Sequence, residues 1–283
     1  YIKRDDLYSI AGCRGGKTRS CWHLAQNADG LITAGSRQSP QAAIVASIAK
    51  HLGIPCRVHT PTGDFTPEML EAQKAGAGIT QHRPGYNSVI VARAREDAKD
   101  RGWTLIPFGM ETPEAVTQTA GQVGNIPKGV KRIVVPVGSG MTLAGILYGL
   151  KRHKMNIPVL GVTVGADPTK RLDKYAPKDW RDMVTLIDSN TAYHKPENAT
   201  LGDIQLDPIY ESKCLKHLQP GDLFWVVGIR KSLASQTQHI RPQWIIGNAL
   251  DVAELASHKR FDFIFSCPPY ADLEVYSDNP QDL

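Results

Sequence analysis

The chain has 283 residues, of which 41% are hydrophobic and 22% are charged, with a formal net charge of +5 at pH 7. This composition is typical of a soluble α/β protein long enough for two compact units. No apolar run approaches the roughly 18–20 residues needed to span a bilayer, so we expect no membrane partner. The mild positive charge permits a nucleic-acid partner without arguing for one.

The cysteines and the chain start bear on the cellular compartment. The five cysteines are scattered, without a Cys-x-x-Cys pair or metal-ligand spacing. We therefore expect free thiols, no metal site and a reducing compartment, the cytoplasm of a bacterial or phage-infected cell. The chain begins with Tyr1 and has no signal-peptide pattern, which predicts a fragment cut at both ends.

The first candidate functional residue in chain order is Lys17, in the segment Gly-Cys-Arg-Gly-Gly-Lys-Thr-Arg. The stretch from Ala11 to Thr18 nearly fits the nucleotide-binding pattern G-x-x-x-x-G-K-[ST]. That loop must follow a buried strand, whereas residues 2–10 are too charged for a central parallel strand. Ala11 also replaces the first glycine. We therefore reject a nucleotide-binding loop here.

Strand and helix patterns alternate between residues 30 and 107. The predicted strands are 30–34, 55–60, 79–82 and 104–107, and the predicted helices are 39–52, 67–75 and 87–101. Such alternation favours parallel βαβ units.

A second candidate site follows the apolar, β-branched run at 133–137. The segment Gly138-Ser139-Gly140-Met141-Thr142 comes next and leads into a helical pattern. Unpaired N–H groups and the positive dipole end of a helix bind anions, and glycines allow the close approach. The pattern indicates a phosphate site, with a merely tight strand–helix connection as the alternative. A lysine near a separate phosphate site favours a Schiff base to pyridoxal phosphate.

Several separated motifs occur in an order that resembles one enzyme family. Ile-Lys-Arg-Asp-Asp-Leu at 2–7, Gly-Gly-Lys-Thr-Arg at 15–19, and Leu-Ile-Thr-Ala-Gly at 31–35 precede the loop at 138–142. This order is similar to that of the fold type II (tryptophan synthase β-like) pyridoxal phosphate enzymes. The nearest branch is that of aminocyclopropane-carboxylate deaminase and D-cysteine desulfhydrase. The resemblance covers about residues 1–230 and implies an α/β, two-domain, three-layer fold with parallel sheets.

The resemblance also implies roles for individual residues. Lys17 matches the Schiff-base lysine, Ser39 a serine that acts near the substrate, and Tyr210 a tyrosine that faces the cofactor. The matching phosphate loop comprises Gly138, Ser139, Gly140, Met141 and Thr142. The implied activity is elimination or deamination of a small amino acid, and a homodimer is the assembly that we expect with it.

Two positions depart from the family pattern. Pro40 stands where the family has an asparagine that contacts the ring oxygen of the cofactor, so Gln41 would have to substitute or the contact is absent. Val227 stands where the family has a threonine that meets the pyridine nitrogen. These departures motivate an alternative hypothesis, that the domain is a catalytically idle binding or scaffolding module.

The resemblance predicts the domain organisation of residues 1–230. A small subdomain at about 36–107 would be inserted into a large one formed by 1–35 and 108–230. The cofactor would lie in the cleft between them, where the C-terminal ends of the strands converge.

The C-terminal part of the chain does not belong to that family. After a predicted polar linker at 231–241, residues 242–283 contain a strand-like run that ends in Ser266-Cys267-Pro268-Pro269-Tyr270. This run resembles the [DNS]-P-P-[YFW] motif of methyltransferases that act on amino groups of DNA bases. In that family the polar residue and the aromatic contact a flipped base, roles that fall here to Ser266 and Tyr270. Cys267 interrupts the motif, and a strand with a proline turn is the alternative.

The fusion implies a bifunctional protein. Residues 242–283 would open a truncated, Rossmann-like domain that uses S-adenosylmethionine and binds DNA. A further hypothesis is that the pyridoxal phosphate domain acts on an amino-acid-like adduct of a DNA base, in phage-type DNA modification.

Overall fold

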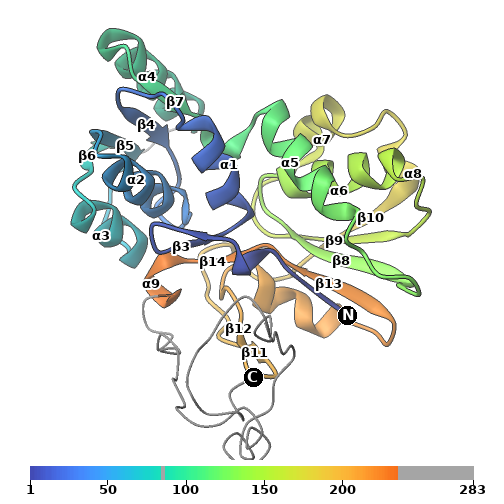
Figure 1. The fold of residues 1–283 in the computed structure, drawn as a ribbon. Helices are drawn as coiled ribbons and strands as arrows, with labels where there is room; N and C mark the ends of the chain where they lie inside the picture. Colours follow the sequence, from blue (N-terminus) through green and yellow to red (C-terminus); the bar gives the residue numbers. More distant parts are fainter. Residues whose placement is uncertain (84–86, 235–283) are drawn as a thin grey trace, which may run out of the picture. The chain divides into compact units, whose positions relative to one another are not determined.

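The computed structural model describes residues 1–83 and 87–234, which belong to one compact unit (Figure 1). Two parallel sheets with helices on their faces dominate this unit. The predicted α/β class with parallel sheets is thereby confirmed. Among the described residues no helix is both long enough and apolar enough to cross a membrane.

The smaller sheet has four parallel strands in the order β6-β5-β4-β7. These are β4 (Leu31–Ala34), β5 (Cys56–Pro61), β6 (Gly78–His82) and β7 (Thr104–Ile106). One face packs on α2 (Gln41–Leu52) and α3 (Pro67–Lys74), and the other packs on α4 (Asn87–Arg101). Successive strand side chains point to opposite faces, so Leu31 packs under α2 while Ile32 packs under α4.

Local signals explain where these helices begin and end. Thr66 caps α3 because its hydroxyl accepts a hydrogen bond from the Met69 N–H, and Pro67 occupies the first helical position. Gly53 ends α2 in the left-handed conformation, with φ of 71°. The predicted helix and strand bounds in this region agree with the structure to within two residues at each end.

The larger sheet has five parallel strands in the order β1-β13-β8-β9-β10. These are β1 (Ile2–Arg4), β8 (Arg132–Val137), β9 (Val159–Thr163), β10 (Val184–Asp188) and β13 (Asp222–Val226). One face carries α5 (Pro113–Val123), α6 (Met141–Arg152), α7 (Thr169–Tyr175) and α8 (Trp180–Met183). Against the other face packs the 3-10 helix η3 (Glu211–His217).

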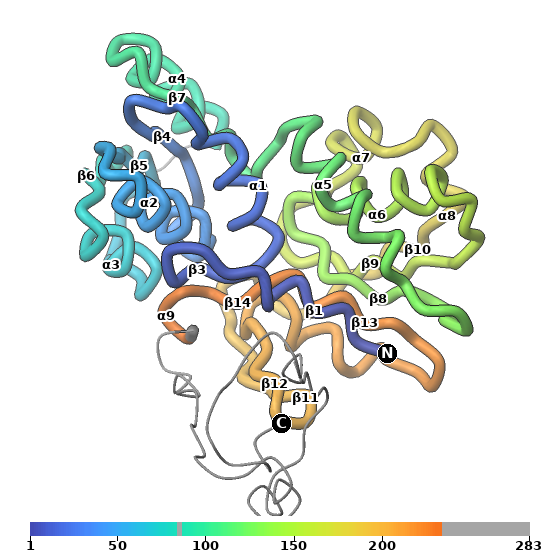
Figure 2. Tube along the Cα trace, viewed as in Figure 1, coloured from blue at the N-terminus to red at the C-terminus, as the bar shows by residue number. Residues whose placement is uncertain are grey.

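The charged segment at the start of the chain forms the edge of the larger sheet. Figure 2 shows β1 running beside β13, far apart in sequence. The Asp5 carboxylate after this strand is 2% exposed and accepts a hydrogen bond from the Trp225 indole N–H at 3.0 Å. An edge position explains how a charged strand joins a parallel sheet, and it agrees with our rejection of a nucleotide-binding loop after a central strand.

The remaining elements are short and belong to neither of the two large sheets. They are η1 (Asp5–Leu7), β2 (Ser9–Ile10), β3 (Cys13–Gly15), α1 (Gly16–Leu24), η2 (Phe108–Met110), β11 (Thr200–Leu201), β12 (Ile204–Gln205), β14 (Gly228–Ile229) and α9 (Lys231–Ala234). Strands β14, β3 and β2 form a small antiparallel sheet, so the segments before Lys17 and after Val226 lie together.

Two predicted boundaries need correction. Strand β4 pairs with β5 and β7, so residues 31–34 belong to the smaller sheet and not to the larger subdomain. A short apolar strand fits either sheet, and the sequence does not state its partners. The predicted linker begins with α9, which the Lys231 amine anchors by donating to the Ser47 hydroxyl at 2.6 Å. The residues at 235–283, with the predicted methyltransferase motif, lie outside the described part.

Candidate functional site

Two adjoining cavities lie between the subdomains of the described unit. One has a volume of about 70 Å³, and the other, which we call the cleft, has a volume of about 620 Å³. Both are lined by Lys17, Gly138, Ser139 and Tyr210. The predicted lysine, the predicted glycine loop and the predicted tyrosine therefore meet at one place, although they are separated by up to 193 positions in sequence.

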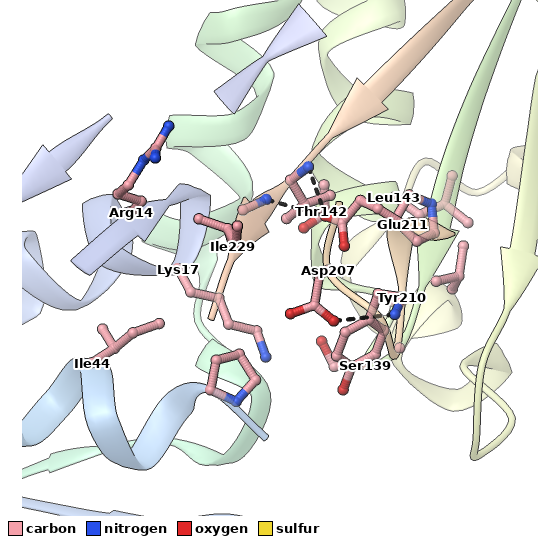
Figure 3. Close-up of a pocket in the computed structure, with 17 residues that line it drawn as sticks. Arg14, Lys17, Ile44, Ser139, Thr142, Leu143, Asp207, Tyr210, Glu211 and Ile229 are labelled. Carbon is pink, nitrogen blue, oxygen red and sulfur yellow. Dashed lines mark hydrogen bonds between the residues drawn. The ribbon is translucent and has the colours of Figure 1, made fainter. Parts of the chain in front are cut away.

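Lys17 is the second residue of α1, directly after β3. Its side chain extends into the cavity toward Asp207 and Ser139 (Figure 3). No hydrogen bond or ion pair ties its amine to another residue of the described chain. Burial lowers the pKa of this amine to about 8, and the carboxylates of Asp207 and Glu211 oppose the shift. The neutral, nucleophilic form of the amine is therefore accessible near neutral pH.

The glycine loop connects β8 to α6 as the sequence predicts. Gly140 precedes α6 with φ of 89°, a conformation that residues with a Cβ rarely adopt. A Cβ on Gly138 would lie 2.7 Å from the Tyr210 ring, so only glycine allows this close approach. The N–H groups of Thr142 and Leu143, in the first turn of α6, have no protein partner among the described residues, and both residues line the small cavity. These donors suit an anion.

Tyr210 takes part in a chain of hydroxyl groups across the cleft. Its hydroxyl lies 3.1 Å from that of Tyr193, which lies 3.0 Å from the Ser36 hydroxyl. Burial raises the pKa of Tyr210 well above 10, and the neighbouring Tyr193 raises it further. Tyr210 is therefore a neutral phenol, and either hydroxyl can be the donor in its hydrogen bond with Tyr193. The sequence analysis missed Tyr193 and Ser36, because no local pattern marks them.

A buried carboxyl group lies behind the Val227 position. Glu211 is 2% exposed, and its Oε1 accepts hydrogen bonds from the N–H groups of Val227 at 3.0 Å and Gly228 at 3.1 Å. Burial, followed by the nearby Asp207, raises the pKa of Glu211 well above its usual value. Asp207 is itself held by Arg230 through two hydrogen bonds of 2.9 Å. The sequence analysis missed Glu211. Its place directly after Tyr210, a predicted site residue, is the signal that could have found it.

The segment at 39–41 supports the cleft in a different way from the one expected. Ser39 lines the large cavity, where its Oγ accepts from the Gln41 N–H at 3.3 Å. The Gln41 side-chain amide donates both of its hydrogens within the protein, to Thr33 Oγ1 and the Pro107 carbonyl, each at 2.8 Å. Gln41 therefore braces the wall of the cleft, and it has no donor left for the ring oxygen of a cofactor.

The remaining predicted residues divide into two groups. Met141 is buried in the core and lines neither cavity. Ser266, Pro268, Pro269 and Tyr270 lie outside the described residues. The four described cysteines are free, and no cluster of potential metal ligands occurs in residues 1–83 and 87–234.

The residues present fit a phosphorylated aldehyde cofactor. The unpaired Lys17 amine faces the small cavity, and Thr142 and Leu143, whose N–H groups are unpaired, line the same cavity. Gly138 and Gly140 carry no side chain that would keep a phosphate away from the loop. A lysine and an anion site between two parallel α/β subdomains are the arrangement that the resemblance to the fold type II pyridoxal phosphate enzymes implies.

Comparison with known proteins agrees with this class. The chain belongs to the family of pyridoxal-phosphate dependent enzymes, whose family model matches residues 1–210. It is 27% identical to 1-aminocyclopropane-1-carboxylate deaminase of Burkholderia ambifaria, over 76% of this chain and 78% of that protein. It is also 27% identical to D-cysteine desulfhydrase of Yersinia pestis (strain Pestoides F), over 78% of this chain and 80% of that protein.

Solved structures with a similar fold agree with this family. The crystal structure of an ACC deaminase homologue superposes with a TM-score of 0.66 at 26% identity, covering 81% of this chain and 83% of that one. The processed form of threonine deaminase isoform 2 from Solanum lycopersicum shares the fold at 14% identity, with a TM-score of 0.57 and coverage of 92% and 79%. The predicted deaminase and desulfhydrase branch is thus confirmed as the one that this chain resembles.

Proposed function

We propose that the protein is a pyridoxal phosphate-dependent lyase that eliminates or deaminates a small amino acid. The observation that carries this proposal is the unpaired Lys17 amine, which shares its cavities with the Gly138–Thr142 loop. The two kinds of relative at 27% identity support it, since one is named a deaminase and the other a desulfhydrase.

Each residue of the site has a part in this proposal. When bound, the cofactor supplies an electron sink that stabilises negative charge on the carbon next to the substrate amine. Lys17 would bind the aldehyde carbon and, once released, move the proton of the substrate's α-carbon with its Nζ. The N–H groups at the start of α6 would bind the phosphate. Ser39 and the neutral Tyr210 hydroxyl would serve as acid, base or nucleophile near the substrate.

Glu211 can make the contact with the pyridine nitrogen of the cofactor that Val227 cannot make. Val227 has no hydroxyl group, but the N–H groups of Val227 and Gly228 hold the Glu211 carboxyl group by hydrogen bonds. A carboxyl group with a raised pKa can share a proton with a pyridine nitrogen. We therefore assign contact with the ring nitrogen to Glu211, which supports an active cofactor and disfavours the idle module that Val227 suggested.

The test is release of a 2-oxo acid and of ammonia or sulfide. The cofactor-loaded protein is incubated with 1-aminocyclopropane-1-carboxylate, with both enantiomers of cysteine and with β-chloroalanine. The proposal predicts product from at least one substrate and none with the Lys17→Ala variant. Cofactor binding without any turnover would instead support the binding or scaffolding module.

Residues 242–283 carry a separate proposal, which rests on the sequence alone. Ser266 to Tyr270 would belong to a DNA methyltransferase domain that needs S-adenosylmethionine, in a cytoplasmic, phage-type modification system. The test is transfer of labelled methyl groups to DNA by a longer chain that includes this domain. Loss of the transfer with Tyr270→Ala would support the proposal, and equal transfer would contradict it. Turnover of modified DNA but not of free amino acids would indicate an adduct as substrate of the first domain.

A further inference from the structure

If the substrate is an α-amino acid, as proposed above, its carboxylate needs a site near Lys17, and that lysine lines the larger cavity. A carboxylate entering a cleft loses water and needs charged or hydrogen-bonding donors in return. Such donors have to come from the walls of the 620 Å³ cavity and must not be engaged within the protein itself.

The segment at the start of α2 has few donors to spare. The Ser39 N–H donates to the Ser36 carbonyl at 3.0 Å, and the Gln41 N–H donates to the Ser39 hydroxyl. Pro40 between them has no N–H at all. The Gln41 side chain is also committed, as described above. The backbone N–H groups at 39–41 therefore do not offer a ready site for a carboxylate.

Arg171 lies on another wall of the same cavity. This residue belongs to α7, and its guanidinium lies 5.7 Å from the centre of the Phe108 ring, which lines the cavity as well. Its Nε donates to Glu111 Oε2 at 2.8 Å. Its two terminal nitrogens have no acceptor among the described residues. One edge of the guanidinium is thus fixed, while the terminal nitrogens remain able to bind an anion.

The charges around Arg171 do not cancel its positive charge. Besides Lys17, Arg171 is the one cationic residue among those that line the cavity in the described chain, and Glu111 is the one anionic residue. Glu111 also accepts from Lys174 at 3.5 Å, so this group of three has a net charge of +1. Arg171 contributes to lowering the pKa of Lys17, which places its charge within electrostatic reach of the reactive amine.

We propose that the Arg171 guanidinium binds the carboxylate of the substrate, held in position by Glu111 and Phe108. This inference rests on the proposed function, because it assumes an amino acid bound next to Lys17. It defines the substrate class as amino acids with a free carboxylate, which should bind more tightly than simple amines and amino-acid amides.

The test compares ligands with and without this carboxylate on the cofactor-loaded protein. Binding of alanine and of alaninamide is followed by the change in the visible spectrum of the cofactor, without any turnover. We expect Arg171→Met to weaken alanine binding by about 10- to 100-fold and to leave alaninamide binding nearly unchanged. Arg171→Lys should recover part of the loss, since it restores the charge without the fork.

Lys174→Met is the matched control, because Lys174 lies on the same helix and contacts the same carboxylate but does not line the cavity. It should bind alanine within about twofold of wild type. Equal weakening by both variants, or equal alanine affinity in Arg171→Met and wild type, would overturn the inference and leave neutral donors to hold the carboxylate. Failure of the proposed function is distinguishable, because wild type would then show no visible band of a lysine-bound cofactor.

Discussion

At the scale of single residues, the site is built from groups that are unfavourable to bury. Lys17 faces the cavity without a fixed ionic partner, and its pKa falls to about 8. Glu211 is buried, and its pKa rises. Both shifts mean that the folded protein disfavours the charged form of the group. Burial of these two groups thus reduces the stability of the protein without a cofactor.

Lys17→Met should therefore stabilise the cofactor-free protein. The shift from 10.5 to about 8 corresponds to about 3 kcal/mol at pH 7. Since the pKa is lower in the folded state, the unfolded wild type binds more protons between pH 8 and 10.5, and wild-type stability rises with pH there. Urea unfolding at pH 7 and pH 9 checks this: the gain of the variant should be smaller at pH 9. A variant less stable than wild type at pH 7 would contradict the cost of burying Lys17.

Gly138→Ala should disturb the loop directly. The added Cβ would lie 2.7 Å from Cε1 of Tyr210, so either the ring or the loop must move. We expect cofactor binding to weaken at least tenfold, measured by titration of the visible band. Gly121→Ala, where a Cβ meets nothing within 4 Å, serves as the control and should bind the cofactor like wild type. Unchanged binding in Gly138→Ala would show that the loop does not hold the cofactor closely.

At the scale of helices and strands, hydrogen bonds between side chains connect the smaller sheet with the helix that covers one of its faces. His59 on β5 bonds through its Nδ1 to His82 Nε2 at 2.8 Å and through its Nε2 to Asp97 Oδ2 at 2.9 Å. Asp97 on α4 also accepts from Arg101 at 2.7 Å. One chain of hydrogen bonds thus connects two strands with the helix that covers them.

This network should make stability fall in mild acid. Burial, and then the neighbouring His59, lowers the pKa of His82 below 6.5. The unfolded chain therefore takes up a proton below about pH 6.5 that the folded protein resists, so stability falls as the pH drops. His82→Asn should reduce the slope of unfolding free energy against pH between about 5 and 7. An identical slope in both proteins would rule out this role for His82.

The sequence predicts the elements better than their pairing. Gly53, Thr66 and Pro67 are local signals, and they place the ends of α2 and α3 correctly. The partners of β4 depend on residues more than 20 positions away, so the sequence alone assigned it to the wrong subdomain. The same limit applies to the site. Lys17 and the glycine loop carry local motifs, whereas Tyr193 and Arg171 reach the cleft only through the fold.

At the scale of the described unit, contacts between the two subdomains complete the site. Ser36 follows β4 of the smaller sheet, while Tyr193 and Tyr210 come from segments that pack with the larger one. The loop that carries Tyr193 is anchored by the buried Lys213, whose amine donates to the Ala192 carbonyl at 3.0 Å. The cleft is therefore defined by contacts across it as well as by each wall.

Tyr193→Phe should weaken the connection across the cleft. Removal of this hydroxyl breaks two hydrogen bonds and should lower the free energy of unfolding by about 1–2 kcal/mol. Tyr148→Phe is the control, because Tyr148 is 51% exposed and has no hydrogen bond among the described residues. Urea unfolding of both variants checks the difference. Equal stability of the two would mean that the hydroxyl chain does not contribute.

The central claim, that Lys17 binds pyridoxal phosphate covalently, has one direct measurement. The protein is mixed with pyridoxal phosphate, its visible spectrum is recorded, and borohydride then reduces the bond before the peptides are analysed by mass spectrometry. Our account predicts a visible band that is absent in Lys17→Ala, and a stable adduct on the peptide that contains Lys17. A band that persists in Lys17→Ala, or an adduct confined to other lysines, would contradict it.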